Sequence, residues 1–385
     1  MKDIGVNSGL TNSIYLVINS FRAGGAEKVN LDLAIEFARR GIHAHLVILK
    51  GNGVPLEVPS GVEIHHMHLD GTSPRHIQSE GHPAVRKLGQ LFSTTGSGER
   101  LQAALGAISS LSLANKLLSF FPAEKVVFWL HFPVTFSDLQ KKNFICKRIR
   151  KRRLSKLYKG MKITIPSKVA KCDFEGIFGS SHSKIRSTYN PLSPSRINAL
   201  ASQPIEQRIV GPSELDGDYW VHAGRFVGQK RHDRLLHAFK LFCERVNSDL
   251  KLVCLGDGQL WDQCRELAKA LGIEHRVIFP GYLANPYPVV HKAKAFVLSS
   301  DFETLPTVLL EALSLGVPCV SVNCPTGPDE ILVGELSNFL TEMNPESLAD
   351  GMCRVWENPP DVSGYDFSRF DPKVVAQQYI DFLQE

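Results

Sequence analysis

Residues 295–323 have the sequence AFVLSSDFETLPTVLLEALSLGVPCVSVN. The two ends of this stretch, Ala295–Ser300 and Pro318–Asn323, are short apolar runs bounded by turn-forming residues, which predicts two buried strands. Between them, Thr307–Leu315 carries apolar residues at helical spacing. A helix that connects two buried strands is the crossover unit of a parallel sheet, so this stretch predicts an α/β fold.

The same alternation of strand and helix continues along the chain. In the first half, strands are predicted at Ser13–Asn19, Ala44–Leu49, Val62–Leu69, Val126–His131 and Ile163–Pro166. In the second half they are predicted at Trp220–Ala223, Leu250–Gly256 and Val277–Pro280, besides the two runs quoted above. Helical periodicity separates them, as in His232–Val246. Two such sets predict two doubly wound, Rossmann-like domains with parallel sheets.

The length of the chain supports two domains, because 385 residues exceed one ordinary hydrophobic core. The stretch from Asn190 to Tyr219 is rich in Pro and Gly turns and has no sustained periodicity. We therefore place the first domain at residues 1–190 and the second at residues 191–371. Ligands of open α/β sheets bind beyond the carboxyl ends of the strands, so a cleft between the two domains is expected.

The composition, 43% hydrophobic and 22% charged, is that of a folded chain and excludes disordered and collagen-like proteins. No apolar run reaches 18 residues, and the apolar run Ile14–Ile18 is too short for a signal peptide. The eight cysteines form no CxxC pair and most lie in apolar runs, so we expect core thiols in a reducing compartment. A cytoplasmic location is therefore expected.

One segment is strongly basic. Residues 141–162 hold eleven Lys and Arg and no acidic residue. The charge of this segment therefore exceeds the net charge of +5 of the whole chain. Interleaved apolar residues such as Phe144 and Ile149 predict an irregular amphipathic helix, and an anionic membrane surface is the expected partner. The cations expected to face the membrane are Lys147, Arg148, Arg150, Lys151, Arg152 and Arg153. Nucleic acid is not expected, because no recognition fold or stacking platform accompanies the charge; a solvated helix face is the alternative.

Two loops that follow predicted strands have the features of phosphate sites. Gly24 and Gly25 precede the helix Glu27–Arg40, where free backbone N–H groups and a positive dipole end favour an anion. The alternative is a tight turn, and without a GxGxxG pattern no dinucleotide cofactor is expected. In the second half, Arg225 and Lys230 follow a strand and are able to bracket a pyrophosphate, unless they belong to a solvated loop.

Carboxylates and histidines complete the candidate groups. Glu303 lies in the turn after a strand, and Glu311 lies about one helical turn inside the helix Thr307–Leu315, within reach of a ribose or sugar hydroxyl. His131 ends a buried strand and is able to hydrogen-bond a substrate, although a lone histidine there is more often structural. His66 and His68 share a strand face but have no adjacent third ligand.

The pattern Asp216-Gly217-Asp218 resembles the paired aspartates that hold a metal in sugar-nucleotide enzymes. Because it lies among turn-forming residues directly before a strand, a plain turn is the preferred interpretation. We expect neither a metal ion nor a cofactor.

Six segments, taken in order, resemble motifs of the retaining glycosyltransferases of family 4, which have the GT-B fold of two facing Rossmann-like domains. They are Gly24-Gly25-Ala26-Glu27, Tyr189-Asn190-Pro191-Leu192, Gly224-Arg225 with Lys230, Phe279-Pro280-Gly281-Tyr282, Glu303 through Gly316, and Asn323 through Leu332. Any one of these matches is weak, but six in the same order are a specific signal. One departure is that Thr304 stands where the family usually has Gly.

The resemblance implies roles for the matched residues. Arg225 and Lys230 would hold the diphosphate of a nucleotide sugar, with the glycine-loop amides of Gly24 and Gly25. Glu311 would bind the ribose, and Tyr282 would lie beside the nucleobase. The residues that would face the donor sugar are Glu303, Thr304, Leu305, Pro306 and Thr307. His131 resembles the family's histidine near the transferred sugar, so His131 and Glu303 are the candidate catalytic residues.

The resemblance also implies an organisation and an activity. The first domain would bind the acceptor and the second the donor, with a final helix at residues 372–385 packed back on the first domain. The expected activity is metal-independent, retaining transfer of a sugar from a UDP-sugar to a lipid-linked or lipopolysaccharide acceptor at the inner face of the membrane. The alternatives are transfer to a small soluble acceptor, a UDP-sugar epimerase, and a nucleotide-sugar-binding protein without transfer activity.

Overall fold

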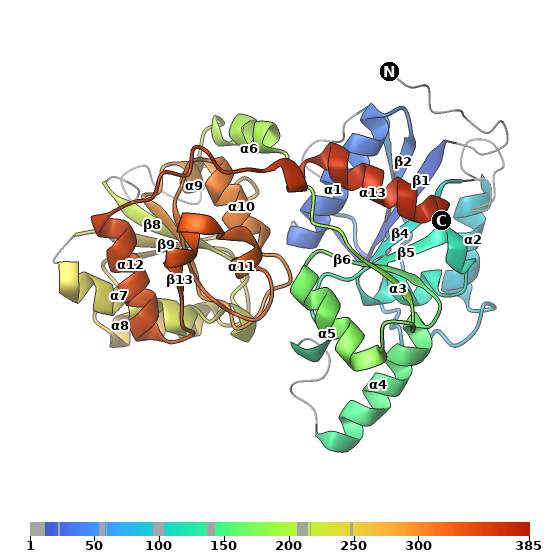
Figure 1. Cartoon of the computed structure of the whole chain (residues 1–385), viewed down its shortest axis with the longest axis horizontal. Helices are drawn as coiled ribbons and strands as arrows, with labels where there is room; N and C mark the ends of the chain where they lie inside the picture. Colours follow the sequence, from blue (N-terminus) through green and yellow to red (C-terminus); the bar gives the residue numbers. More distant parts are fainter. Residues whose placement is uncertain are drawn as a thin grey trace. The chain divides into compact units, whose positions relative to one another are not determined.

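The computed structural model of the chain (Figure 1) describes residues 12–21, 24–53, 58, 60–94, 104–136, 143–205, 215, 217–246 and 249–385. The chain divides into two compact units, which are considered separately below. Unit 1 comprises Met1–Pro191 with Ser368–Glu385, and unit 2 comprises Leu192–Phe367. Each unit is built on one parallel sheet, which confirms the predicted α/β fold class.

Unit 1 holds a seven-stranded sheet with the strand order β3-β2-β1-β4-β5-β6-β7, and all its pairs are parallel. Its strands are β1 Ser13–Ile18, β2 His43–Ile48, β3 Val62–His66, β4 Gly106–Ser110, β5 Val126–Trp129, β6 Lys162–Ile165 and β7 Lys184–Ser187. Two of these, β4 and β7, are not predicted from the sequence. The β4 segment, GAISS, lacks the run of large apolar residues that identifies the other strands, yet it lies at the centre of the sheet and is wholly buried.

Helices cover both faces of this sheet. One face packs on α1 Gly25–Arg39 and α13 Pro372–Gln384, through a core that includes Phe37 and Tyr379. The other face packs on α2 Pro83–Thr94, α3 Ser112–Leu118, α4 Phe144–Tyr158 and α5 Lys168–Phe178. The α13 helix is bound to this unit by hydrogen bonds as well, because Nζ of Lys162 donates to the Leu383 carbonyl at 3.0 Å.

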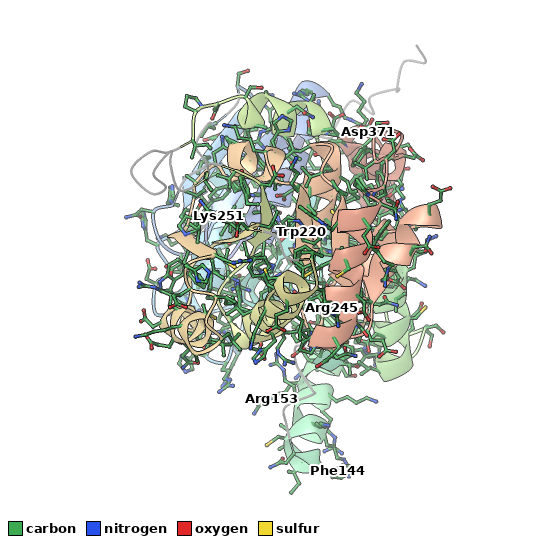
Figure 2. All side chains as sticks on the ribbon, turned by 90° about the vertical axis from the view of Figure 1, so that its left-hand side faces the viewer. Phe144, Arg153, Trp220, Arg245, Lys251 and Asp371 are labelled. Atoms are coloured by element: carbon green, nitrogen blue, oxygen red, sulfur yellow. The ribbon has the colours of Figure 1, made fainter. Side chains whose placement is uncertain are left out.

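Unit 2 holds a six-stranded parallel sheet with the strand order β10-β9-β8-β11-β12-β13. Its strands are β8 Tyr219–Ala223, β9 Lys251–Leu255, β10 Val277–Gly281, β11 Ala295–Leu298, β12 Cys319–Val322 and β13 Leu340–Thr341. Its helices are α6 Pro194–Ala201, α7 His232–Val246, α8 Trp261–Ala270, α9 Tyr287–His291, α10 Thr307–Ser314, α11 Pro328–Ile331 and α12 Pro345–Glu357. In the interior, the buried Trp220 ring packs on Phe242 of α7 with centroids 5.1 Å apart, and Figure 2 labels Trp220.

The cysteines are all free, as expected, but they are not all in the core. Cys254, Cys264, Cys319 and Cys324 are buried, and burial raises the pKa of each thiol. Cys146 and Cys172 are exposed, so the interpretation of all eight as core residues is wrong for these two. Over the described residues, no helix has both the length and the apolar character needed to cross a membrane.

Candidate functional site

Each sheet has one point at which the strand order reverses. From β1 the chain adds β2 and β3 on one side and then β4 on the other, and in unit 2 it does the same from β8 to β11. Ligands of doubly wound folds bind at the carboxyl ends of the strands beside such a switch point. In unit 2, the loops beside the switch point are those that follow β8 and β11.

An ion pair joins these two loops of unit 2. Nζ of Lys230 lies 2.6 Å from Oε1 of Glu303, and the two side chains are only 15% and 11% exposed. The backbones are joined as well: the amide of Asp301 donates to the Gln229 carbonyl at 2.8 Å, and Oγ of Ser299 donates to the Lys230 carbonyl at 2.9 Å. The structure thus brings together two of the residues that the sequence predicts for the donor site.

Arg225 is held differently from Lys230. Its side chain is exposed, while its neighbour Phe226 is fully buried and stacks on the ring of His232 with centroids 3.9 Å apart. The amide of Phe226 also donates to the Asp257 carbonyl at 2.9 Å. The backbone that carries Arg225 is therefore fixed, and its guanidinium faces solvent, where an anionic ligand can reach it.

Glycine makes this close packing of loops possible. Gly256, in the loop after β9, has a φ of +129°, and a Cβ on this residue would lie only 2.0 Å from the Gly224 carbonyl oxygen. No other residue type fits without moving the loop that holds Arg225.

The segment from Glu303 to Glu311 is buried. Its members with little exposure are Glu303, Thr304, Leu305, Pro306, Thr307 and Glu311. The loop after β12 supports it from one side: Oγ1 of Thr326 donates to the Glu303 carbonyl, and a Cβ on Gly327 would lie 2.8 Å from the Thr304 carbonyl oxygen. Thr304 has no positive φ, so its departure from the family's Gly is free of backbone strain.

Tyr282 lies apart from this buried segment. It follows Gly281 at the end of β10, two strands from β8, and its side chain is 46% exposed. The predicted place of Tyr282 beside a nucleobase stays a prediction.

Two buried histidines lie beneath the loop after β8 and are not predicted from the sequence. Nδ1 of His222 lies 2.8 Å from the Val297 carbonyl, while Nε2 of His222 and both ring nitrogens of His232 have no hydrogen-bond partner. Burial lowers the pKa of His222 to about 4 and that of His232 to about 2. Both rings are therefore neutral near pH 7, which avoids adding positive charge under Lys230.

In unit 1, His131 belongs to a buried polar network at the switch point. Its Nε2 lies 3.3 Å from Oγ of Ser110 at the end of β4, and Nδ2 of Asn30 on α1 lies 2.9 Å from the same hydroxyl. Burial lowers the pKa of His131 to about 3, so the ring is neutral and acts through hydrogen bonds. Ser110 is not predicted because β4 is not recognised as a strand, and Asn30 is not predicted because its contact with Ser110 spans 80 residues of sequence.

The backbone just after Ser110 is strained. Leu111 has φ 74° and ψ 169°, a region that only glycine adopts readily, and it directly precedes α3. The amide of Ala114, in the first turn of α3, donates to Oδ1 of Asn19 after β1 at 3.1 Å. Strain and side-chain hydrogen bonds thus coincide at the carboxyl ends of β1 and β4.

The glycine loop of unit 1 begins α1 as predicted. Gly24 is the extended residue before the helix, and the Glu27 carboxylate folds back so closely that a Cβ on Gly24 would lie 2.5 Å from Oε2 of Glu27. Arg22 and Ala23 lie outside the described residues. Because the two units are described separately, the predicted role of Gly24 and Gly25 beside the donor diphosphate stays a prediction.

The basic segment forms α4, a single helix that begins after the Asn143 cap, whose side chain accepts from the Cys146 amide at 2.9 Å. Leu154 and Tyr158 are buried against unit 1, whereas Phe144 is 78% exposed, Ile145 68% and Ile149 47%. The predicted helix is therefore present, and the apolar residues interleaved with its cations are partly buried and partly exposed. Figure 2 shows Phe144 and Arg153 on this helix.

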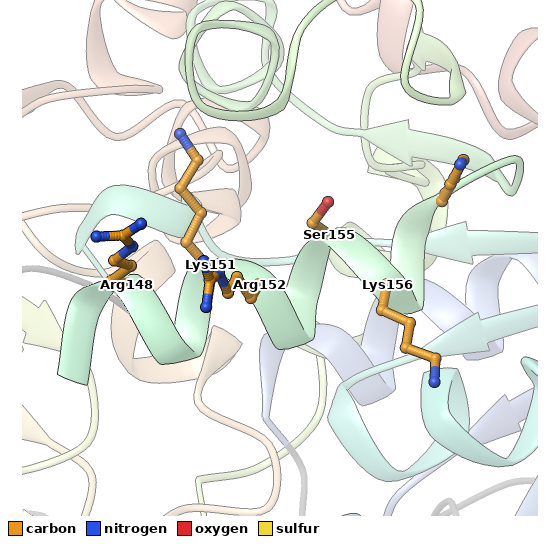
Figure 3. A pocket seen from close by; sticks show the side chains of 6 residues that line it. Arg148, Lys151, Arg152, Ser155 and Lys156 are labelled. Atoms are coloured by element: carbon orange, nitrogen blue, oxygen red, sulfur yellow. The ribbon is translucent and has the colours of Figure 1, made fainter. Parts of the chain in front are cut away.

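Cations line a pocket along α4 (Figure 3). It has a volume of about 490 Å³ and is lined by Arg148, Lys151, Arg152, Ser155, Lys156 and Lys159. Positive charges with one hydroxyl and no carboxylate form a surface that suits a phosphate-bearing partner.

The remaining metal-like patterns of the sequence have simple structural accounts. The rings of His66 and His68 stack on each other with centroids 5.9 Å apart. Asp218 pairs with Lys294 at 3.3 Å on the surface before β8, and Asp216 lies outside the described residues.

The strand order and the loops at both switch points define a GT-B fold, which solved structures also support. The structure of Anabaena HepE in complex with UDP and glucose superposes with a TM-score of 0.71, at 18% identity, covering 96% of this chain and 99% of that one. At this identity the likeness concerns the fold alone.

The family match lies within unit 2. Residues 205–364 match the family described as Glycosyl transferases group 1. The lipopolysaccharide 1,6-galactosyltransferase of Escherichia coli K12 is 32% identical over 172 residues, which is 40% of this chain and 46% of that protein. A Campylobacter jejuni N-acetylgalactosaminyltransferase named for a diphospho-undecaprenol acceptor is 30% identical over 162 residues, 42% of this chain and 43% of that protein. The chain thus spans about half the length of the curated relatives it matches.

These matches confirm the resemblance predicted from the sequence: the chain has a GT-B fold and resembles bacterial glycosyltransferases of lipopolysaccharide and lipid-linked glycans. The more specific assignment to retaining family 4 stays a prediction.

Proposed function

We propose that this protein is a retaining glycosyltransferase that moves a sugar from a UDP-sugar to a membrane-associated glycan or lipid-linked acceptor. The observation that carries this proposal is the ion pair between Lys230 and Glu303, which joins the loops after β8 and β11 at the switch point of unit 2. That unit contains the match to group 1 glycosyl transferases, and the UDP in the similar HepE structure supports the choice of nucleotide.

The diphosphate would lie against Arg225 and Lys230. Cleavage of the bond between sugar and phosphate leaves negative charge on the departing nucleotide, and fixed cationic donors stabilise that charge by roughly 3 kcal/mol each. Arg225 is exposed on a rigid backbone, and Lys230 is already oriented by Glu303. When the donor binds, Lys230 would be shared between the phosphate and Glu303.

The donor sugar and the ribose would lie against the segment from Glu303 to Glu311. Glu303 would contact the sugar, and Glu311 would contact the ribose. The burial of these carboxylates supports this, because a desolvated carboxylate binds hydroxyl groups more strongly than one in water. Tyr282 would stack beside the base.

The chemistry proposed for this site uses no metal ion and no cofactor. In transfer with retention of this type, the acceptor hydroxyl attacks from the side that the diphosphate leaves, and a phosphate oxygen takes its proton. His131 would then serve as a neutral hydrogen-bonding group near the transferred sugar, which the low pKa caused by its burial supports.

The acceptor is proposed to be at the cytoplasmic face of the membrane, with α4 as the surface contact. The six cations of residues 147–153 and the exposed Phe144, Ile145 and Ile149 support this assignment. The lipopolysaccharide and diphospho-undecaprenol acceptors in the names of the two relatives are consistent with it.

The proposal is tested by release of nucleoside diphosphate from a panel of nucleotide sugars, with and without bacterial lipid extract. Transfer predicts release from a UDP-sugar that requires the extract. A product formed without any acceptor would instead indicate an epimerase, and binding without turnover would indicate a binding protein. Release of nucleoside diphosphate with small soluble acceptors alone would contradict a membrane-associated acceptor but would still indicate a transferase.

A further inference from the structure

Three side chains able to bind a metal ion converge on one face of the sheet of unit 1, namely His45 on β2 with Glu63 and His65 on β3. Nδ1 of His45 lies 3.1 Å from Nε2 of His65 and 3.4 Å from Oε2 of Glu63. Nε2 of His65 lies 3.6 Å from Oε1 of Glu63. One ligand atom from each of the three residues lies within 4.8 Å of the other two, close enough for all three to bind the same metal ion.

The register of the two strands produces this cluster. His45 is the direct partner of Glu63, and His65 follows Glu63 by two residues on the same face. In the sequence, the stretch Glu63–His68 has the residue types of a metal site, but alternation along a strand offers no third ligand beside His66 and His68. Glu63 and His65 obtain theirs from His45, which is 18 residues before Glu63 and is brought close only by strand pairing.

Zinc binds His nitrogen and carboxylate oxygen at roughly 2.0–2.2 Å, which places tetrahedral ligand atoms about 3.3–3.6 Å apart. The separations of 3.1, 3.4 and 3.6 Å lie near this range, and the two distances to Glu63 are to different oxygens of its carboxylate. A hydrogen bond between the two rings accounts for the 3.1 Å distance alone. Its single proton lies between the two nitrogens and leaves both carboxylate oxygens beside them, where a cation would be stabilised.

The ligands are held in place but remain accessible. His45 is 7% exposed and stacks on Tyr15 with ring centroids 4.6 Å apart, and Tyr15 packs in turn on Phe92 of α2. The Glu63 side chain is 65% exposed, which gives an ion a path from solvent.

We propose that His45, Glu63 and His65 bind one divalent transition-metal ion, zinc in the first instance, and that this ion ties the edge strand β3 to β2. Two imidazoles and one carboxylate are a donor set that zinc takes, with a fourth position left for water. The site lies at β3, the edge strand of the sheet, which is two strands away from β1 and the switch point between β1 and β4. It therefore revises the expectation of a metal-free protein without altering the proposed reaction.

The test uses the untagged full-length protein, treated with a chelator and then titrated with Co²⁺ and with Zn²⁺. We expect one Co²⁺ per chain with the intense visible absorption of a tetrahedral site, its displacement by Zn²⁺, and a rise in Tm with either ion. Glu63→Gln and His65→Ala should each weaken binding at least tenfold. His66→Ala, one residue away on the opposite face of β3, should leave binding unchanged.

Glu63→Gln keeps the test decisive even if His65→Ala fails to fold, because the Glu63 side chain is exposed and Gln has the same shape. Absence of stoichiometric Co²⁺ and Zn²⁺ binding by the wild type would overturn the proposal. Equal weakening by His66→Ala and Glu63→Gln would overturn it as well, because the ion would then not depend on this face of the strand.

Discussion

The Lys230 ammonium and the Glu303 carboxylate lie 2.6 Å apart, although the two residues are separated by 73 positions in the sequence. Each belongs to a loop that follows a central strand of unit 2, and each is mostly buried. A buried ion pair contributes little net stability, but loss of one partner leaves the other charge desolvated and unpaired. Lys230 therefore supports the folded loops as well as the proposed diphosphate site, whereas Arg225 is free of that structural role.

The difference between the two cations predicts a separation of activity from stability. Arg225→Ala should cut turnover at least tenfold while changing the free energy of unfolding by less than about 0.5 kcal/mol, because its side chain is exposed. Lys230→Ala should cut turnover as much and also lower stability by about 1–3 kcal/mol, because Glu303 loses its partner. Steady-state kinetics and urea unfolding measure the two effects; near-normal turnover in either variant would exclude that residue from the diphosphate site.

The network around His131 predicts coupling between two residues of unit 1. Ser110→Ala removes the hydroxyl that links His131 to Asn30, so it should lower stability by about 1–3 kcal/mol and reduce turnover. If the hydroxyl acts on the reaction through His131, the loss of turnover in the double variant with His131→Ala should be smaller than the sum of the two single losses. Additive effects on the activation free energy would show that Ser110 and His131 act independently.

The buried His232 predicts a pH dependence of stability. Its folded pKa of about 2 lies below the ordinary value of 6.5, so below pH 6.5 the unfolded chain binds a proton that the folded chain does not. The stability that neutral His232 contributes is fully present above pH 6.5. Below that pH the contribution decreases by up to about 1.4 kcal/mol per pH unit. His232→Phe should remove that slope and preserve the stacking on Phe226.

Urea unfolding at pH 7.5 and pH 5.5 measures this effect. His237→Phe, on the exposed side of the same helix, is the matched control and should keep the slope of the wild type. A wild-type slope in His232→Phe would show that this ring is not held neutral in the folded protein.

The basic helix predicts reversible binding to anionic membranes. At low salt, the wild type should co-sediment with vesicles that contain anionic lipid and not with neutral vesicles. Replacing Arg148, Lys151, Arg152 and Arg153 by Gln should weaken binding more than 100-fold, at about 1 kcal/mol per cation. The charge-matched control replaces four exposed cations of unit 2, Arg265, Lys269, Lys292 and Lys294, and should bind like the wild type. Equal loss in both variants would indicate a general charge effect and no role for α4.

Much of this fold follows from hydrophobic patterning, and the exceptions have physical causes. Strands such as β5 and β11 are continuous apolar runs buried on both faces, so their sequences identify them. The central strand β4 is built from small and polar residues that become acceptable only because Asn30, Asn115 and His131 hydrogen-bond to them. Asn30 and His131 lie 80 and 21 residues away from Ser110 in the sequence, so local patterning does not reveal the strand.

In the candidate sites too, local sequence patterns identify single residues but not the contacts that the fold creates between them. Loops that follow strands mark Arg225, Lys230 and Glu303 as candidates, but their sequences do not show that Lys230 contacts Glu303. The histidines His222 and His232 are invisible as a pair, because they meet only when α7 packs on β8. Pairing of β2 with β3 likewise creates the cluster of His45, Glu63 and His65 from residues that have no motif of their own.

The central claim, that Arg225 and Lys230 bind the diphosphate of a UDP-sugar, is tested most directly by calorimetric titration with UDP and with uridine. We predict that the wild type binds UDP at one site. Arg225→Ala and Lys230→Ala should each weaken the binding of UDP at least tenfold and leave the binding of uridine unchanged. Lys269→Ala, an exposed cation at the end of α8, should affect neither ligand. No UDP binding by the wild type, or full UDP affinity in both site variants, would contradict the claim.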